Sequence, residues 1–277
     1  MNFTILGATG FIGRHLLAHL TQQGHEVWAP AKGEPEIFSR PLGHVFYCIG
    51  MTADFRQKPY DTVRAHVGVL ADVLQHGSFE SLVYLSSTRV YARNHIANEQ
   101  SQIVVDPNDP SDLYNLSKLA GESLCHSCGR AGVKVTRLSN IVGADLQSGN
   151  FIFELIRESM SGCMTLQSHP GSSKDYLWID DAVGLLETIA IAGKQSVYNV
   201  ASGVNLCHRD LAECLARLTG ASVHFEPDAP LLEFPRIDTR RIVDEFSFAP
   251  QPVVDYLPRL ISLFADDGAR LPKREVR

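Results

Sequence analysis

The sequence predicts an α/β fold, in which helices cover both faces of a doubly wound parallel sheet and a smaller C-terminal lobe follows. Short apolar runs alternate with longer amphipathic stretches up to about residue 143. Strands that alternate with helices form right-handed βαβ units, and such units build parallel sheets. Beyond residue 143 the alternation loosens, and glycines and prolines interrupt it more often.

Overall composition restricts the class of protein. The 277 residues suffice for one large domain or two closely joined ones, and a hydrophobic fraction of 44% is typical of a globular chain. The net charge is −6 without a run of lysines or arginines, so we expect no nucleic-acid partner. No apolar stretch approaches the roughly 20 residues of a membrane helix, and no basic leader precedes an apolar core. We therefore expect a cytoplasmic protein.

The six cysteines are scattered through apparent core segments, which indicates reduced thiols. Cys125 and Cys128 have the spacing of a metal-binding pair. They lie within a helical stretch and lack a second pair of ligands, so we expect no metal site.

The elements of the first half follow from apolar periodicity. In Phe11–Gln23, the residues Ile12, Leu16 and Leu20 recur at helical spacing, and Gly24 follows as a stop signal. Short apolar runs bounded by glycines are read as buried strands. In this way we expect strands at 2–6, 26–29, 44–49, 82–86 and 133–138, and helices at 11–23, 60–75 and 112–129.

The second half has fewer and weaker signals. Asp180 and Asp181 would stabilise the positive end of a helix that begins there, and Gly220 would close another. On this basis we expect helices at 151–160, 180–191 and 208–218, a strand at 197–200, and short helices separated by prolines in the last forty residues.

A glycine-rich turn follows the first strand and opens the first helix. Gly7, Gly10 and Gly13 would permit a tight turn, close approach of a pyrophosphate, and packing of the helix on the strand. The helix N-terminus offers unpaired N–H groups to the anion. We therefore expect a bound dinucleotide, with contacts from these glycines and from the loop residues Thr9, Phe11, Ile12 and Arg14.

Three polar residues predict acid–base chemistry. Tyr114 and Lys118 are four residues apart, so they share a face of the expected helix. An ammonium group near a phenol favours the phenolate, and a phenol tuned in this way can exchange a proton with a carbinol or a carbonyl. Hydroxyl side chains follow one another at the end of the strand at 82–86, in Ser86, Ser87 and Thr88.

These motifs together resemble those of the extended short-chain dehydrogenase/reductase family, particularly its sugar-nucleotide-modifying branch. The resemblance rests on GATGFIG at 7–13, the Ser87-x-x-Val-Tyr strand end, Tyr114-x-x-x-Lys118, and weaker matches at 137–143, 174–182 and 197–203. It implies a Rossmann-type sheet and a homodimer formed through the helices at 60–75 and 112–129. It also implies that Ser87 hydrogen-bonds the reacting oxygen, with Ser86 and Thr88 as alternatives. It also implies cofactor contacts at Ile49, Gly50, Tyr114, Lys118 and Ile141, and substrate contacts at Thr88, Asn140, Lys174 and Arg236.

The resemblance also implies that different parts of the chain bind the cofactor and the substrate. Residues 1–145, with a return segment near 174–203, would bind the dinucleotide. Residues 146–173 and 204–277 would form the smaller substrate-binding lobe.

The chain departs from the family pattern near the cofactor adenosine. After the second strand, Ala31 stands where NAD-preferring relatives have an acid, and Lys32 and Arg14 would suit a 2′-phosphate. We therefore favour NADP over NAD. About a dozen residues separate Lys32 from the strand starting at His44, where the family fits a helix and another strand, so we expect that βα portion to be missing.

The expected reaction is hydride transfer to or from a sugar carbon, as reduction of a nucleotide-linked 4-keto sugar or as epimerisation. Dehydration is disfavoured, because Thr88 and Arg89 stand where dehydratases carry an Asp-Glu pair. Two alternatives remain open: a catalytically weak or inactive dinucleotide-binding regulatory protein, and a reductase of a non-sugar carbonyl.

Overall fold

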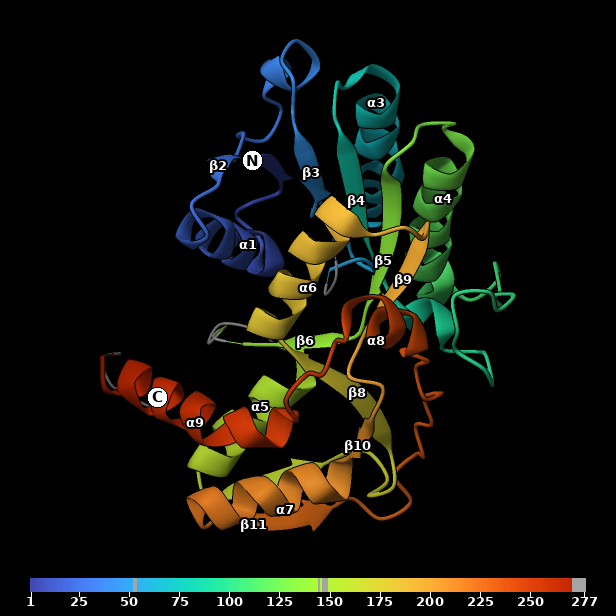
Figure 1. Cartoon of the computed structure of the whole chain (residues 1–277). Coiled ribbons are helices and arrows are strands. Elements are labelled where there is room, and N and C mark those ends of the chain that lie inside the picture. Colours follow the sequence, from blue (N-terminus) through green and yellow to red (C-terminus); the bar gives the residue numbers. More distant parts are fainter. Residues whose placement is uncertain (52–53, 144, 146–148, 271–277) are drawn as a thin grey trace.

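The computed structural model describes residues 1–51, 54–143, 145 and 149–270. Within these residues the main sheet has six strands, all parallel, in the order β2-β1-β3-β4-β5-β9 (Figure 1). The strands are β1 (Asn2–Leu6), β2 (Glu26–Trp28), β3 (His44–Tyr47), β4 (Ser81–Ser87), β5 (Val133–Leu138) and β9 (Val197–Val200). The predicted α/β fold with a parallel sheet is confirmed.

Helices cover both faces of this sheet, because alternate side chains of each strand point to opposite sides. Helices α1 (Phe11–Gln22) and α6 (Ile179–Ala192) pack on one face, where Phe46 belongs to the same core as α6. The other face is covered by α3 (Val69–His76) and α4 (Leu113–Ser127), and there Val45 lies in a second core.

The helix expected at 60–75 is interrupted by a π-helical turn. The chain runs through α2 (Pro59–Val63), a π-turn (Arg64–Gly68) and α3. Backbone carbonyls of this turn accept hydrogen bonds from strand tyrosines: Tyr47 donates to Ala65 at 2.6 Å and Tyr84 donates to His66 at 3.3 Å. Such turns are frequent at functional sites.

The smaller lobe contains strands that sequence periodicity did not predict. One sheet has the order β10-β8-β6 and a second pairs β11 with β7. These strands are β6 (Asn140–Val142), β7 (Cys163–Leu166), β8 (Ser173–Trp178), β10 (Asn205–Cys207) and β11 (Ser222–Phe225). They are three to six residues long, which is too short for a clear alternation signal.

Two helices of the second half, α5 (Phe151–Met160) and α7 (His208–Thr219), have the predicted bounds to within one residue. The last forty residues contain α8 (Arg240–Phe246), which is short as expected, and α9 (Leu257–Arg270), which is longer than expected. Figure 1 shows α5, α7 and α9 gathered around the smaller lobe. The core on the α6 face of the main sheet continues into this lobe through Phe153 and Leu211, so the two lobes share one hydrophobic interior.

The sheet ends abruptly at β2. Only a 3₁₀ turn (Pro35–Phe38) lies between β2 and β3. Among the described residues no further strand pairs with β2, so the predicted loss of a βα portion is confirmed.

The structure also bears on membrane helices, disulfides and metal sites. No helix in the described part of the chain is long and apolar enough to cross a membrane. All six cysteines are free thiols. No cluster of three or more potential metal ligands occurs among the residues with described positions.

Candidate active site

The glycine loop between β1 and α1 has the shape that an anion-binding turn needs. Gly7 has φ +90°, a conformation that L side chains rarely adopt. A Cβ added at Gly13 would lie 2.3 Å from the Gly7 carbonyl oxygen, so only glycine allows this packing of helix on loop. Helix α1 has no side-chain cap and no acid in its first turn. Its N–H groups are therefore suited to a pyrophosphate.

The loop side chains next to these glycines differ in exposure. Thr9 and Gly10 are exposed, whereas Phe11 and Ile12 are half-buried. Arg14 forms an ion pair with Asp145 at 3.2 Å, and its guanidinium lies 5.2 Å from the Phe11 ring centroid.

Lys32 is exposed on the turn after β2. The two cations that we expected to favour a 2′-phosphate therefore have different surroundings, because Arg14 already has a carboxylate partner.

The structure brings Ser87, Tyr114 and Lys118 together at the carboxyl end of β4. The Ser87 hydroxyl oxygen accepts a hydrogen bond from the Arg89 N–H at 3.2 Å, which leaves the hydroxyl proton available to donate. Ser87 also hydrogen-bonds the Tyr114 side chain. The serine thus caps the turn after the strand and contacts the phenol at the same time.

Lys118 lies one helical turn beyond Tyr114 and is buried. Its ammonium donates to the Leu85 carbonyl at 2.8 Å and lies 6.0 Å from the Tyr114 ring centroid. Burial lowers the pKa of Lys118 to about 8, although the charge of Glu122 opposes the shift. A Cβ on Gly50 would be 3.4 Å from the lysine nitrogen, so these two predicted cofactor contacts adjoin.

The electrostatics of Tyr114 differ from what the sequence suggested. Burial raises the pKa of Tyr114 above its ordinary value, and the Ser87 hydrogen bond and the charge of Arg89 oppose the rise. The spacing of Tyr114 and Lys118 predicted that Lys118 would lower the pKa of the phenol. In the folded chain the guanidinium of Arg89, 5.3 Å from the Tyr114 ring centroid, has this effect.

His66 connects the loop after β3 with the catalytic helix. Burial and the charge of Lys118 lower the pKa of His66 to about 3, so the ring is neutral. Its Nε2 accepts from the Met51 N–H at 3.2 Å, so Nδ1 carries the proton and donates to the Ser117 hydroxyl at 2.8 Å. Ser117 then donates to the Tyr114 carbonyl at 2.9 Å.

A buried ion pair supports the site from behind. Glu122 of α4 accepts from Arg137 of β5 at 2.6 Å and from the Ser86 hydroxyl at 2.5 Å. Arg137 also donates to the Tyr91 hydroxyl at 2.6 Å. This network joins the strand that bears Ser87 to the helix that bears Tyr114 and Lys118.

The predicted substrate residues do not gather at one place. Thr88 is buried and donates to the Leu138 carbonyl at 3.3 Å, so its hydroxyl is used by the fold. Asn140 is exposed and donates to the Asp175 carbonyl at 2.8 Å. Arg236 is exposed and donates to the Gly203 carbonyl at 2.6 Å.

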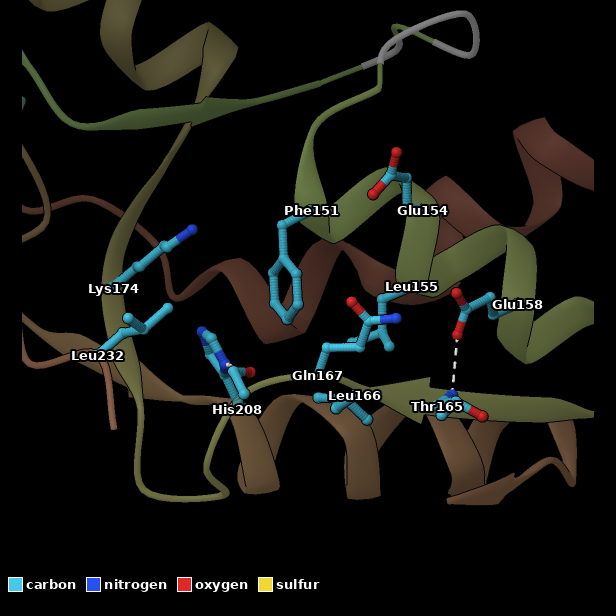
Figure 2. A pocket seen from close by; sticks show the side chains of 11 residues that line it. Phe151, Glu154, Leu155, Glu158, Thr165, Leu166, Gln167, Lys174, His208 and Leu232 are labelled. Atoms are coloured by element: carbon cyan, nitrogen blue, oxygen red, sulfur yellow. Dashed lines mark hydrogen bonds between the residues drawn. The ribbon is translucent and has the colours of Figure 1, made fainter. Parts of the chain in front are cut away.

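Lys174 is the predicted substrate residue that lines a pocket. This pocket of about 300 Å³ lies in the smaller lobe between α5, β7 and the start of α7 (Figure 2). Lys174 approaches the Phe151 ring, at 5.2 Å from its centroid, and His208 stacks on the same ring at 4.4 Å. The buried Nε2 of His208 has no hydrogen-bond partner among the described residues.

Several residues around Tyr114 escaped sequence analysis. Phe55 packs 5.6 Å from the Tyr114 ring, and His66 meets that ring edge-on at 5.3 Å. Arg89 entered only as an argument against dehydration. Phe55, His66 and Arg89 become neighbours of Tyr114 only in the folded chain, and no local pattern marked them.

The profile of the "NAD dependent epimerase/dehydratase family" matches residues 3–201. Among solved structures, the chain is similar to MoeE5 in complex with UDP-glucuronic acid and NAD, with 20% identity, a TM-score of 0.80, and coverage of 96% of this chain and 100% of that chain. It is similar to RMD from Pseudomonas aeruginosa complexed with NADPH, with 21% identity, a TM-score of 0.77 and coverage of 96% and 100%. The UDP-glucuronic acid 4-epimerase from Bacillus cereus has 17% identity, a TM-score of 0.78 and coverage of 96% and 99%. No curated protein matches the sequence.

Proposed function

Because the chain belongs to the NAD dependent epimerase/dehydratase family, we propose that it transfers hydride between a nicotinamide dinucleotide and a carbon of a nucleotide-linked sugar. The outcome is reduction of a 4-keto sugar or epimerisation. The observation that carries this proposal is the contact between Ser87 and Tyr114 beside the buried Lys118. The similar structures named above hold NAD or NADPH and, in two cases, a UDP-sugar ligand, which supports the substrate class.

The residues of the chain fit a dinucleotide along the carboxyl ends of β1, β3 and β4. Gly7, Gly10 and Gly13 would hold the pyrophosphate, and Gly50 and Lys118 would adjoin the nicotinamide ribose, with Ile49 and Ile141 as further contacts. When bound, the nicotinamide supplies or accepts the hydride.

Tyr114 exchanges the proton at the substrate oxygen. Ser87 donates a hydrogen bond to that oxygen and holds it against the phenol. The positive charge of Arg89 and the hydrogen bond with Ser87 favour the phenolate in a site where burial disfavours it. Dehydration would need a further acid–base pair, and the residues after Ser87 are Thr88 and Arg89.

We propose NADP as the preferred cofactor. The absence of an acid at Ala31 and the exposed ammonium of Lys32 support it. Because Arg14 is paired with Asp145, most of the preference for the 2′-phosphate would come from Lys32.

We further propose a homodimer formed through α2–α3 and α4. Tyr60 and Val63 of α2 are 87% and 41% exposed, which supports this face as the contact. Light scattering at micromolar concentration should give twice the mass of one chain, and a monomer would contradict the proposal.

The test of the proposed function uses purified protein, NADPH or NADH, and a panel of nucleotide sugars that includes 4-keto compounds. Products are separated by chromatography, so that epimerisation without net cofactor turnover is also detected. We expect Tyr114→Phe to lower turnover by at least about a hundredfold while cofactor binding survives. Tyr256→Phe removes the hydroxyl of a half-buried tyrosine of the smaller lobe and is the matched control. Unchanged turnover in Tyr114→Phe, or no hydride transfer with any sugar, would refute the proposal.

A further inference from the structure

A half-buried arginine lies against the catalytic tyrosine. Arg89 follows Ser87 by two residues, and its guanidinium carbon is 5.3 Å from the Tyr114 ring centroid and 5.0 Å from the Phe55 ring centroid. The strand end and the 3₁₀ turn Thr88–Tyr91 hold it there. A positive charge at this position would interact electrostatically with a ligand bound beside the phenol.

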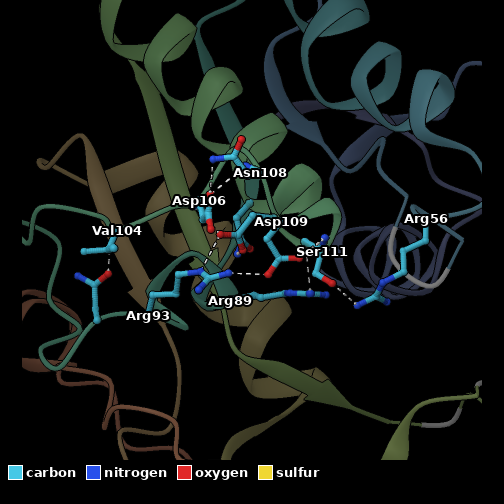
Figure 3. A network of polar contacts seen from close by, with 11 residues as sticks. Arg56, Arg89, Arg93, Val104, Asp106, Asn108, Asp109 and Ser111 are labelled. Carbon is cyan, nitrogen blue, oxygen red and sulfur yellow. Dashed lines mark hydrogen bonds and ion pairs between the residues drawn. The ribbon is translucent and has the colours of Figure 1, made fainter.

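Two other cations lie near Arg89. Arg56 packs on Phe55 at 4.5 Å and donates to the Ser111 hydroxyl at 3.2 Å, while Arg89 donates to the Ser111 carbonyl at 3.4 Å. Figure 3 shows both arginines converging on Ser111. Burial, and after it the charge of Arg89, lower the pKa of Lys174 in the smaller lobe.

The nearest carboxylates, Asp109 and Asp112, raise the pKa of Arg89 through their charge, against the effect of burial. Their ion pairs, however, are with Arg93, at 2.5 Å and 2.8 Å, and Figure 3 shows the pair with Asp109. In the parts of the chain with described positions, no carboxylate forms an ion pair with Arg89, Arg56 or Lys174. A partly buried cation without a counter-ion is costly unless an anion arrives with the ligand.

We propose that Arg89, assisted by Arg56, binds a carboxylate on the sugar ring of the substrate, so that the chain acts on a nucleotide-linked acidic sugar. The inference rests on the proposed function. Since the guanidinium touches the ring of the residue that exchanges the proton, an anion bound to it lies within about one sugar ring of the reacting carbon.

The same arrangement would reject neutral sugars. A neutral hexose would leave the guanidinium half-buried and without its anion, and sites built for a charged or hydrogen-bonding group discriminate strongly against ligands that lack it. Arginine suits the role better than lysine, because its planar fork matches the two oxygens of a carboxylate.

The experiment compares matched acidic and neutral probes by calorimetry. One pair is UDP-glucuronic acid and UDP-glucose; the other is glucuronate 1-phosphate and glucose 1-phosphate, which carry no base. The full chain is loaded with NADP⁺ and carries Tyr114→Phe, so that turnover does not consume the probe. We expect the acidic member of a pair to bind at least about tenfold more tightly.

Variants assign this preference to a residue. Arg89→Gln should remove the preference and Arg89→Lys should retain part of it. Lys58→Gln removes the same charge from a lysine of the Arg56 segment that already has Asp54 as a partner at 3.2 Å, and it should retain the full preference.

Three results would overturn the inference. These are equal binding of acidic and neutral probes, no binding of either acidic probe, and equal weakening of both members by Arg89→Gln, which would assign Arg89 to the phosphate groups. Failure of the proposed function is distinguishable, because then no nucleotide sugar of either charge supports hydride transfer. If neutral sugars are turned over as well as acidic ones, the proposed function stands and the inference about Arg89 fails.

Discussion

The two ends of the dinucleotide crevice differ in how much protein supports them. At the carboxyl end of β4, Tyr114 and Lys118 are buried, and hydrogen bonds through His66 and Glu122 fix the helix that carries them. At the other end β2 is a three-residue edge strand, and the turn that follows is exposed.

This difference indicates that chemistry and cofactor affinity are built by separate parts of the chain. The missing βα portion removes protein only from the adenosine end. The buried network behind α4 is intact, so the loss concerns the adenosine end alone, and we expect modest cofactor affinity.

The largest expected effect comes from a substitution in the buried network at the carboxyl end of β4. Glu122→Ala leaves Arg137 buried without its counter-ion, and the free energy of unfolding should fall by about 3–5 kcal/mol. Denaturant titration measures this. Glu36→Ala removes an exposed ion pair with Arg40 at the adenosine end and should cost less than about 1 kcal/mol. Equal losses in the two variants would erase the contrast between the ends.

The second-largest expected effect comes from a substitution in the glycine loop between β1 and α1. Gly13→Ala forces a methyl group against the Gly7 carbonyl and should destabilise the fold by about 1–3 kcal/mol, with weaker cofactor binding. Gly184→Ala in α6 is the matched control, because an added Cβ there meets nothing within 4 Å. That control should stabilise the helix by up to about 1 kcal/mol. Thermal unfolding with and without NADPH separates the two outcomes.

A smaller effect concerns cofactor choice at the exposed end. Lys32→Gln should weaken NADPH binding by about tenfold and leave NADH binding almost unchanged, because only NADPH carries the 2′-phosphate. Fluorescence titration with both cofactors measures the ratio. A parallel loss for NADH would assign Lys32 a role unrelated to that phosphate.

The smallest effect depends on pH at the catalytic end. Burial lowers the pKa of Lys118 to about 8, so the ammonium predominates below that pH and is lost above it. Cofactor affinity should therefore decline by about threefold between pH 7 and pH 9.5, as a favourable charge beside the ribose disappears. Affinity that rises over this interval would show that the lysine does not contact the cofactor as a cation.

Local signals in the sequence were sufficient for much of the fold. Helix α5 has the predicted bounds 151–160, because its apolar residues recur with helical periodicity over three turns. The strands of the main sheet were readable as buried apolar runs. The short strands β6, β7, β8, β10 and β11 were not, since each depends on a partner distant in sequence.

The candidate site divides in the same way. Tyr114 and Lys118 share a helix and Ser87 ends a strand, so spacing and the family resemblance predicted that these three residues would act together. The positions of Arg89, Phe55 and His66 around the phenol depend on how three separate segments pack, and no local pattern encodes that.

By itself the sequence determined the order of strands and helices, the glycine turn and the residue types available for proton transfer, because these depend on interactions within a few residues. Only the tertiary structure decided which cation faces Tyr114, which carboxylates are already paired, and which hydroxyls are used by the fold. Burial and long-range charge set those properties, and both arise when segments far apart in the chain pack together.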